Sequence, residues 1–233
     1  MRLILASASP RRAELLRAAG FTFDAFAADV EESIRPGESP SAYVRRLAAD
    51  KSAAVQTAQK YVESGFSRTE VAQKYVGSGF SRTEDSPPEG GLHVRHDGPP
   101  EGGLHAPVIL GADTAVVIDG EILGKPRDDD DAARMLRRLS GTRHEVLTGV
   151  SLRQGTSELG RVETTAVYFR ALLEEDIAWY VASGEGRDKA GAYAIQGLAS
   201  RFIPRIDGSY SNVVGLPIAC VAELLRSLLA SGR

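Results

Sequence analysis

Cysteine, tryptophan and methionine are scarce in this chain, which has one, one and two of them among its 233 residues. The single cysteine, Cys220, excludes an internal disulfide. Its apolar surroundings predict a buried residue of the core and not a nucleophile.

A basic excess and long apolar runs are also missing. The formal net charge is −3, which argues against a surface for polyanions, so we expect no nucleic-acid partner. A small phosphorylated ligand stays compatible, because a cleft can be basic in an acidic protein. No apolar run approaches the length of a membrane span, and the run after Arg2 is too short for a signal peptide. We therefore expect a cytoplasmic protein without a membrane partner.

Internal repeats occupy the middle of the chain. Residues 58–70 recur almost unchanged at 72–84, and residues 85–93 recur at 97–105. Two copies of each unit are too few for a repeat fold, and the second pair is rich in proline and glycine. The pattern predicts a duplicated insertion at about 57–106.

The rest of the chain, taken with this insertion, fits a single domain over residues 1–233. Its 42% hydrophobic and 25% charged residues are ordinary for a globular protein. The insertion holds His93, His96 and His105, which lack cysteine partners and regular ligand spacing. We do not expect a metal site there.

The most informative stretch, residues 7–12, reads Ser-Ala-Ser-Pro-Arg-Arg and precedes a helical pattern that ends at Gly20. Ser9 is a preferred N-cap and Pro10 a preferred first helical residue, so a helix should begin here. A capping box would place Glu or Gln where Arg12 stands. Backbone N–H groups, hydroxyls and guanidinium groups together suit a phosphate; a capped helix with two solvated arginines is the alternative.

A second Ser-Pro helix start, at Pro40, predicts a helix with Lys51 on its apolar face. Such a lysine either runs along apolar surface to solvent, which the position itself favours, or reaches into a polar cleft. Glu32, just before this helix, fits a solvated turn equally well.

Asp113 stands inside a long apolar stretch. The Asp119-Gly120 pair predicts a hairpin, which places Asp113 at a break within a pair of apolar strands. A carboxylate there must be hydrogen-bonded, titrate abnormally or bind a cation. Because the surrounding run is so apolar, a functional role is favoured over a structural hydrogen bond. Lys125 follows at the exit of the hairpin. The acidic residues 128–131 open a further helix, where acids are stabilising, and are not expected to bind metal.

Two later residues attract attention. A helix expected over 173–183 places Trp179 in the core. Gln196 lies between apolar residues of an expected strand. Its amide offers a donor and an acceptor, as reading a base edge requires, although in a strand such a residue is more often structural.

Taken in order, these motifs resemble the Maf family over residues 1–56 and 107–230. The matching motifs are Ser-x-Ser-Pro-Arg-Arg, Glu-Glu, the helical lysine, Gly-Ala-Asp-Thr, Gly-Lys-Pro, Tyr-x-Ile-Gln-Gly, Gly-Ser-Tyr and Val-Val-Gly-Leu-Pro. Members are cytoplasmic pyrophosphatases, first linked to septum formation, that convert a nucleoside triphosphate and water to the monophosphate and pyrophosphate. The resemblance implies an α/β fold like that of inosine triphosphatase: a mixed twisted sheet with flanking helices, elongated and two-lobed, with a central cleft. It also implies a divalent cation, Mg²⁺ or Mn²⁺, and often a homodimer.

The resemblance further implies residue roles. The Ile-Gln-Gly motif is similar to the branch that cleaves dTTP and UTP, whereas a 7-methyl-GTP branch carries Glu near this position. The family's proton acceptor corresponds to Asp113, and its specificity positions to Arg11, Thr114 and Gln196. Residues expected around the triphosphate correspond to Ser9, Arg12, Lys51 and Lys125. The expected metal ligands are Glu32 and Asp113.

Two alternatives stay open at this point. One is a nucleotide-binding regulator of septum formation with little hydrolysis. The other is a house-cleaning pyrophosphatase with a different base preference, such as modified pyrimidines or a purine.

Overall fold

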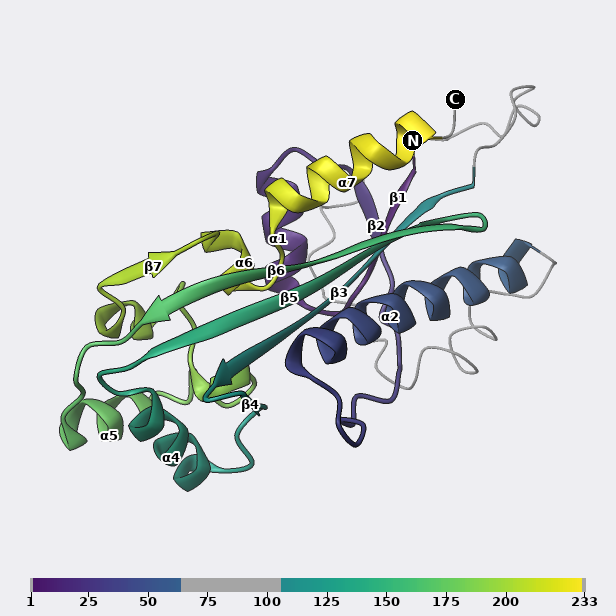
Figure 1. Cartoon of the computed structure of the whole chain (residues 1–233). Coiled ribbons are helices and arrows are strands. Elements are labelled where there is room, and N and C mark those ends of the chain that lie inside the picture. The colour runs from purple at the N-terminus through teal and green to yellow at the C-terminus, as the bar shows by residue number, and fades with distance from the viewer. Residues whose placement is uncertain (1, 64–105, 232–233) are drawn as a thin grey trace, which may run out of the picture.

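The computed structural model describes residues 2–63 and 106–231 (Figure 1). In that part of the chain, seven strands form one mixed sheet in the order β2-β1-β3-β5-β6-β7, and β4 pairs with β3 off this path. The strands are β1 (Leu3–Ala6), β2 (Phe23–Ala25), β3 (Val108–Ile118), β4 (Glu121–Leu123), β5 (Arg143–Gln154), β6 (Ser157–Tyr168) and β7 (Arg205–Asp207). The helices are α1 (Pro10–Ala18), α2 (Pro40–Glu63), α4 (Asp129–Leu139), α5 (Glu174–Ala182), α6 (Tyr210–Val214) and α7 (Ile218–Ser231), with two short 3₁₀ helices, η1 (Ala190–Ala192) and η2 (Leu198–Phe202).

Both Ser-Pro motifs begin helices, as the sequence predicts. Ser9 caps α1 by accepting a hydrogen bond from the backbone N–H of Arg12. Helix α2 begins at Pro40 and continues to Glu63, so the first residues of the expected insertion prolong this helix. Residues 64–105, with the three histidines of the repeats, lie outside the described residues. None of the helices in the described part has the length and hydropathy of a membrane span.

Other local predictions are confirmed as well. Asp119 and Gly120 have φ of 52° and 79°, as a tight hairpin between β3 and β4 requires. Asp128 caps α4, whose first turn is acidic. Cys220 is buried in the core.

The prediction that Trp179 belongs to the core is wrong. Its side chain is 40% exposed, and the guanidinium of Arg201 stacks 4.5 Å from its ring centroid. Helix α5 buries Ile177 and Tyr180 instead, which lie three residues apart on one helix face. Trp179 lies between them in sequence and therefore points away from the core.

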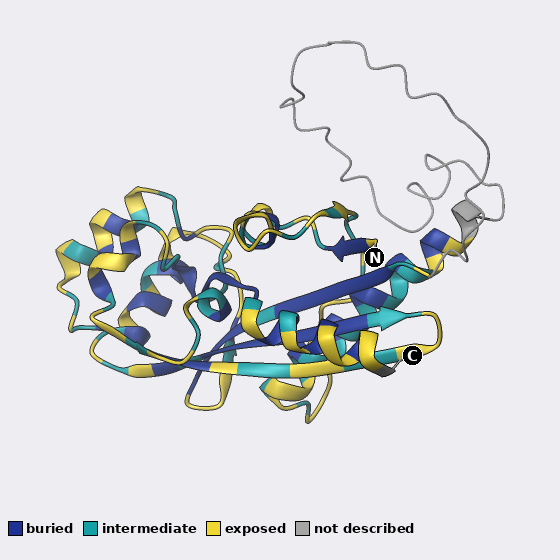
Figure 2. Cartoon of the chain, turned by 90° about the horizontal axis from the view of Figure 1, so that it is seen from above, coloured by how far each residue is buried: buried dark blue, intermediate teal, exposed yellow. Residues whose placement is uncertain are grey.

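Two apolar clusters lie on one face of the long strands, at opposite ends of the molecule. Along β3, Leu110 and Ala112 pack in the cluster under α1 and α7, whereas Val116 and Ile118 pack in the cluster beside α4 and α5. Thr114 lies on the same face between these two pairs and interrupts the row of apolar side chains. Strands β3, β5 and β6 run the length of the molecule and join two lobes, as predicted (Figures 1 and 2).

Helix α2 covers the opposite face of the sheet and lies against the strand backbone. A Cβ added at Gly111 or Gly149 would stand 2.1 Å from the carbonyl oxygen of Ala48 or Val44. Only glycine permits this approach. Gly111 therefore serves the close packing of α2 on the sheet.

The predicted break at Asp113 is wrong. Strand β3 pairs with β5 without interruption from Ile109 to Val117, and Asp113 stands opposite Gly149 in this register. The Asp113 carboxylate is stable inside the strand because Lys51 of α2 forms an ion pair with it.

Replacing Gly149 by Ala should lower the free energy of unfolding by about 1–3 kcal/mol, because the new methyl group overlaps the Val44 carbonyl and forces α2 outward. Urea denaturation measures this change. Gly124→Ala is the matched control, since a Cβ there meets nothing within 4 Å. Equal stabilities of the two variants would contradict the close packing of α2.

Because His144 is buried, we expect the protein to lose stability in mild acid. Its Nε2 bonds the Tyr193 hydroxyl at 2.8 Å, and its Nδ1 has no partner among the described residues. Burial, helped by the charge of Arg143, lowers the pKa of His144 from 6.5 to about 4. Between these values the unfolded chain binds a proton that the folded one does not, so stability falls as the pH falls.

Thermal unfolding followed from pH 7 to pH 4.5 checks this linkage. The melting temperature should fall less steeply in His144→Gln, which keeps a polar partner for Tyr193 but does not titrate. Identical slopes for the variant and the unchanged protein would show that His144 does not contribute.

Candidate active site

A cavity of about 590 Å³ lies between the two lobes, within the range of small-molecule sites. Its walls carry every residue to which the sequence assigns a role: Ser9, Arg11, Arg12, Glu32, Lys51, Asp113, Thr114, Lys125 and Gln196. Its cationic side chains are Arg11, Arg12, Lys51, Lys125 and Lys189, and its acidic ones are Glu32, Asp113 and Asp188. The cavity is therefore basic although the chain is acidic.

The cavity borders a gap in the sheet. Strand β1 pairs with β3 only as far as Gly111, and β4 begins to pair with it at Val116. Since β5 occupies the other edge of β3 throughout, no strand of the described part of the chain lies beside residues 112–115 on this edge. Neighbouring side chains of a strand point to opposite faces, yet at an open edge both Asp113 and Thr114 border the same cavity.

Lys51 reaches into this cavity from α2. Its Nζ donates to Asp113 Oδ1 at 2.6 Å and pairs with Glu32 Oε1 at 2.7 Å. The expectation that Lys51 runs to solvent is wrong, because its helix face lies directly on the sheet and only 8% of the residue is exposed. The ammonium is instead satisfied by two carboxylates.

Glu32 lies at the rim of the cavity with about half of its side chain exposed. Burial raises its pKa, but the hydrogen bond and charge of Lys51, with the charges of Lys125 and Arg12, outweigh that effect and hold the pKa of Glu32 below its ordinary value. It is thus an anion at neutral pH that lies in an exposed loop and pairs with Lys51.

Tyr43 was not singled out from the sequence. It lies two helical turns before Lys51, and its hydroxyl donates to the Glu32 backbone carbonyl at 3.0 Å. Burial, with the charges of Asp113 and Glu32, raises the pKa of Tyr43 to about 12. The spacing of eight residues from Lys51 was the available signal.

Arg12 ties the helix start to the open strand edge. Its guanidinium donates to the carbonyl oxygens of Gly215 and Ala112, both at 2.8 Å, and to the hydroxyls of Ser7 and Thr114, both at 3.2 Å. Burial lowers its pKa. Because a guanidinium has five N–H groups, one remains for a ligand. Its contact with a phosphate stays a prediction.

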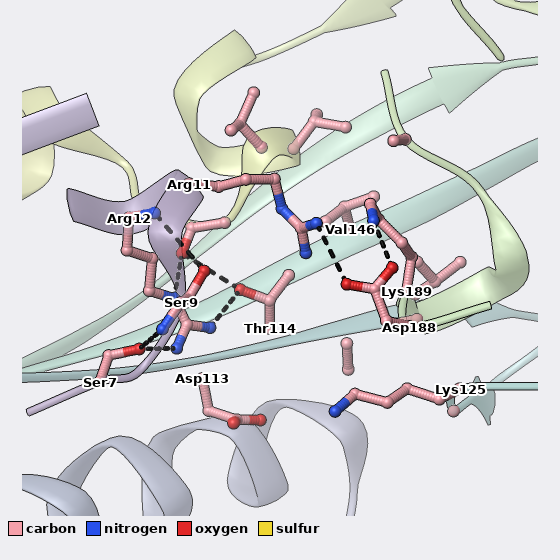
Figure 3. A pocket seen from close by; sticks show the side chains of 18 of the residues that line it. Ser7, Ser9, Arg11, Arg12, Asp113, Thr114, Lys125, Val146, Asp188 and Lys189 are labelled. Atoms are coloured by element: carbon pink, nitrogen blue, oxygen red, sulfur yellow. Dashed lines mark hydrogen bonds and ion pairs between the residues drawn. The ribbon is translucent and has the colours of Figure 1, made fainter. Parts of the chain in front are cut away.

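The other cations project into the cavity (Figure 3). Arg11 lies 3.8 Å from Asp188, which also pairs with Lys189. Lys125 reaches toward Asp113 from the opposite wall, and within the described residues it has no ion pair. Lys189 was missed from the sequence, where a charged run just before Gly191 was the only signal.

Gln196 does not lie in a strand, so that prediction is wrong. Gly191 and Ala192 have φ of 69° and 59°, which breaks any extended backbone, and a turn follows. The turn brings Gln196 to the cavity wall, where its amide has no hydrogen bond to another described residue.

The residues present fit a divalent cation that binds together with a phosphorylated ligand. The described residues contain no group of three or more His, Cys, Asp and Glu side chains suited to a metal. Two carboxylates nevertheless meet at Lys51, and Mg²⁺ is usually held by one or two carboxylates plus substrate phosphates.

Comparison with known proteins agrees with the order of motifs. The sequence matches the family described as Maf-like protein over residues 2–228. A protein named dTTP/UTP pyrophosphatase from Anaeromyxobacter dehalogenans is 45% identical over 229 residues, covering 97% of this chain and 93% of that protein. Proteins of the same name are 45% identical in Geobacter sulfurreducens, with 97% and 96% covered, and 44% identical in Hahella chejuensis, with 97% and 91% covered. A match over nearly its whole length shows that the chain belongs to the Maf-like protein family.

Proposed function

We propose that this protein hydrolyses dTTP and UTP to the monophosphate and pyrophosphate. The observation that carries the proposal is the position of Asp113, a carboxylate at an open strand edge in a basic cavity. The relatives named dTTP/UTP pyrophosphatase support the substrate class.

The triphosphate is proposed to lie along the basic wall of the cavity. Its negative charges would be met by Lys51, Lys125 and Lys189, by the remaining N–H of Arg12, and by the start of α1 with Ser9. Lys125 is the most available of these cations, because no carboxylate among the described residues holds it.

Asp113 is proposed to orient a water molecule and accept its proton. Lys51 holds Oδ1 of this carboxylate, which leaves Oδ2 to face the water. The water oxygen forms a bond to the α-phosphorus, and the bond from that phosphorus to the bridging oxygen breaks. Pyrophosphate leaves with the bonding electrons, and the surrounding cations stabilise its charge.

Glu32 and Asp113 are the residues that would hold a divalent cation, Mg²⁺ or Mn²⁺. When bound, such a cation lowers the pKa of a coordinated water and offsets phosphate charge. A homodimer and a cytoplasmic location stay predictions from the sequence.

The base is proposed to meet Gln196, Thr114 and Arg11. Neither the NH₂ nor the carbonyl oxygen of the Gln196 side chain bonds another described residue, which suits the donor and acceptor on the edge of uracil or thymine. The Thr114 hydroxyl already contacts Thr148 and Arg12, so we expect it to shape this side of the cavity more than to read the base.

Purified protein with a panel of nucleoside triphosphates tests the proposed function. With Mg²⁺ or Mn²⁺, dTTP and UTP should give the monophosphate and pyrophosphate at higher kcat/KM than purine triphosphates, and EDTA should abolish turnover. Tight binding without turnover would favour a nucleotide-binding regulator, and a higher rate with a purine would favour a different base preference.

Asp113→Asn should lose a factor of about 10²–10⁴ in kcat, because the amide cannot accept the proton from water. Asp119→Asn is the control, since it makes the same change at the exposed hairpin turn, where Asn tolerates positive φ. Turnover of Asp113→Asn close to that of the control would remove Asp113 from this role.

A further inference from the structure

The turn that carries Gln196 is fastened at both ends to one pair of side chains. The backbone N–H of Ala194 donates to the Tyr180 hydroxyl at 3.1 Å. After the turn, the N–H of Leu198 donates to Glu185 Oε2 at 2.9 Å and that of Ala199 to Oε1 at 3.4 Å. The turn itself closes with a bond from Gly197 N–H to the Ala194 carbonyl, at 3.2 Å.

The two anchoring side chains also hold each other. The Tyr180 hydroxyl donates to Glu185 Oε1 at 2.9 Å while it accepts from Ala194, so one hydroxyl links both ends of the turn. Only 1% of Tyr180 is exposed, and its ring packs 5.5 Å from that of Phe202. The anchor therefore rests on the core of its lobe.

The turn packs directly against the side chain of Glu185. A Cβ at Gly197 would stand 2.1 Å from Glu185 Oε2, so the turn backbone lies directly on the carboxylate. Ala194, Ile195 and Gln196 line the cavity, whereas Tyr180 and Glu185 do not. Tyr180 and Glu185 can therefore affect a bound nucleotide only by changing the position of the turn.

We propose that Tyr180 and Glu185 are positioning residues that fix this turn as the wall against which the nucleobase is selected. The proposal rests on the proposed function, in which Gln196 meets the base. A pyrimidine has one ring and a purine two, so a wall that yields admits the larger base. Loss of the anchor should therefore relax base selection while Asp113 and Lys51, on other elements, continue to act.

Two variants test this role with little change in volume. Tyr180→Phe removes the hydroxyl and keeps the buried ring. Glu185→Gln leaves one oxygen where two accept hydrogen bonds. Glu174→Gln is the control, because it neutralises an exposed glutamate of the same lobe whose one partner among the described residues is Arg137.

The ratio of kcat/KM for UTP to that for GTP should fall about tenfold in both variants, with kcat for UTP changed less than about threefold. The control should keep the ratio of the unchanged protein. Hydrogen exchange gives a readout that does not depend on activity: amides in residues 194–199 should exchange faster in both variants.

Faster exchange with an unchanged ratio would overturn the proposal, because the turn would then be loose without consequence for selection. An equal loss of kcat for every nucleotide would also overturn it, since that result indicates a merely structural role. Unchanged exchange would show that the anchor does not hold the turn. If the unchanged protein hydrolyses no triphosphate, the proposed function fails by itself, and calorimetric affinities for UTP and GTP replace the kinetic ratio.

Discussion

The site depends on the two ion pairs that one ammonium group, Nζ of Lys51, makes. This group joins Asp113 on the sheet to Glu32 at the rim of the cavity. A cation with so little exposure is tolerable only when it is paired, and here two carboxylates pair it. The arrangement exists because α2 lies against the strand backbone, and it can lie there because Gly111 and Gly149 have no side chain.

The second determinant is the gap between β1 and β4 on the edge of β3. An unpaired strand edge leaves backbone groups that need partners, and Arg12 donates to one of them, the carbonyl of Ala112. The same guanidinium reaches Gly215, which lies just before the C-terminal helix. Arg12 thus stabilises the edge at which the proposed chemistry takes place. With the edge open, Asp113 on one face and Thr114 on the other border a single cavity.

Local features were predictable because the residues that determine them are neighbours in sequence. The caps at Ser9 and Asp128 and the turn at Asp119 are examples. Errors arose where distant segments decide the outcome. The path of Lys51 depends on how closely α2 meets the sheet, and the exposure of Trp179 depends on which face of α5 meets its lobe.

The composition of the site was predictable for another reason. The order of motifs assigns roles to nine residues, and all nine line one cavity. It could not give the contacts between distant segments. Arg12 with Gly215, Arg11 with Asp188, and Tyr180 with the turn of Gln196 all join parts of the chain that only the fold brings together.

A crystal structure with a UTP analogue, in which an imido group replaces the oxygen between the α- and β-phosphorus, would show where the scissile bond lies relative to Asp113. With Mg²⁺ present, we expect the α-phosphate beside Asp113 at the open edge of β3 and the base against Gln196. A nucleotide bound away from that edge, or with its base directed away from Gln196, would contradict this arrangement.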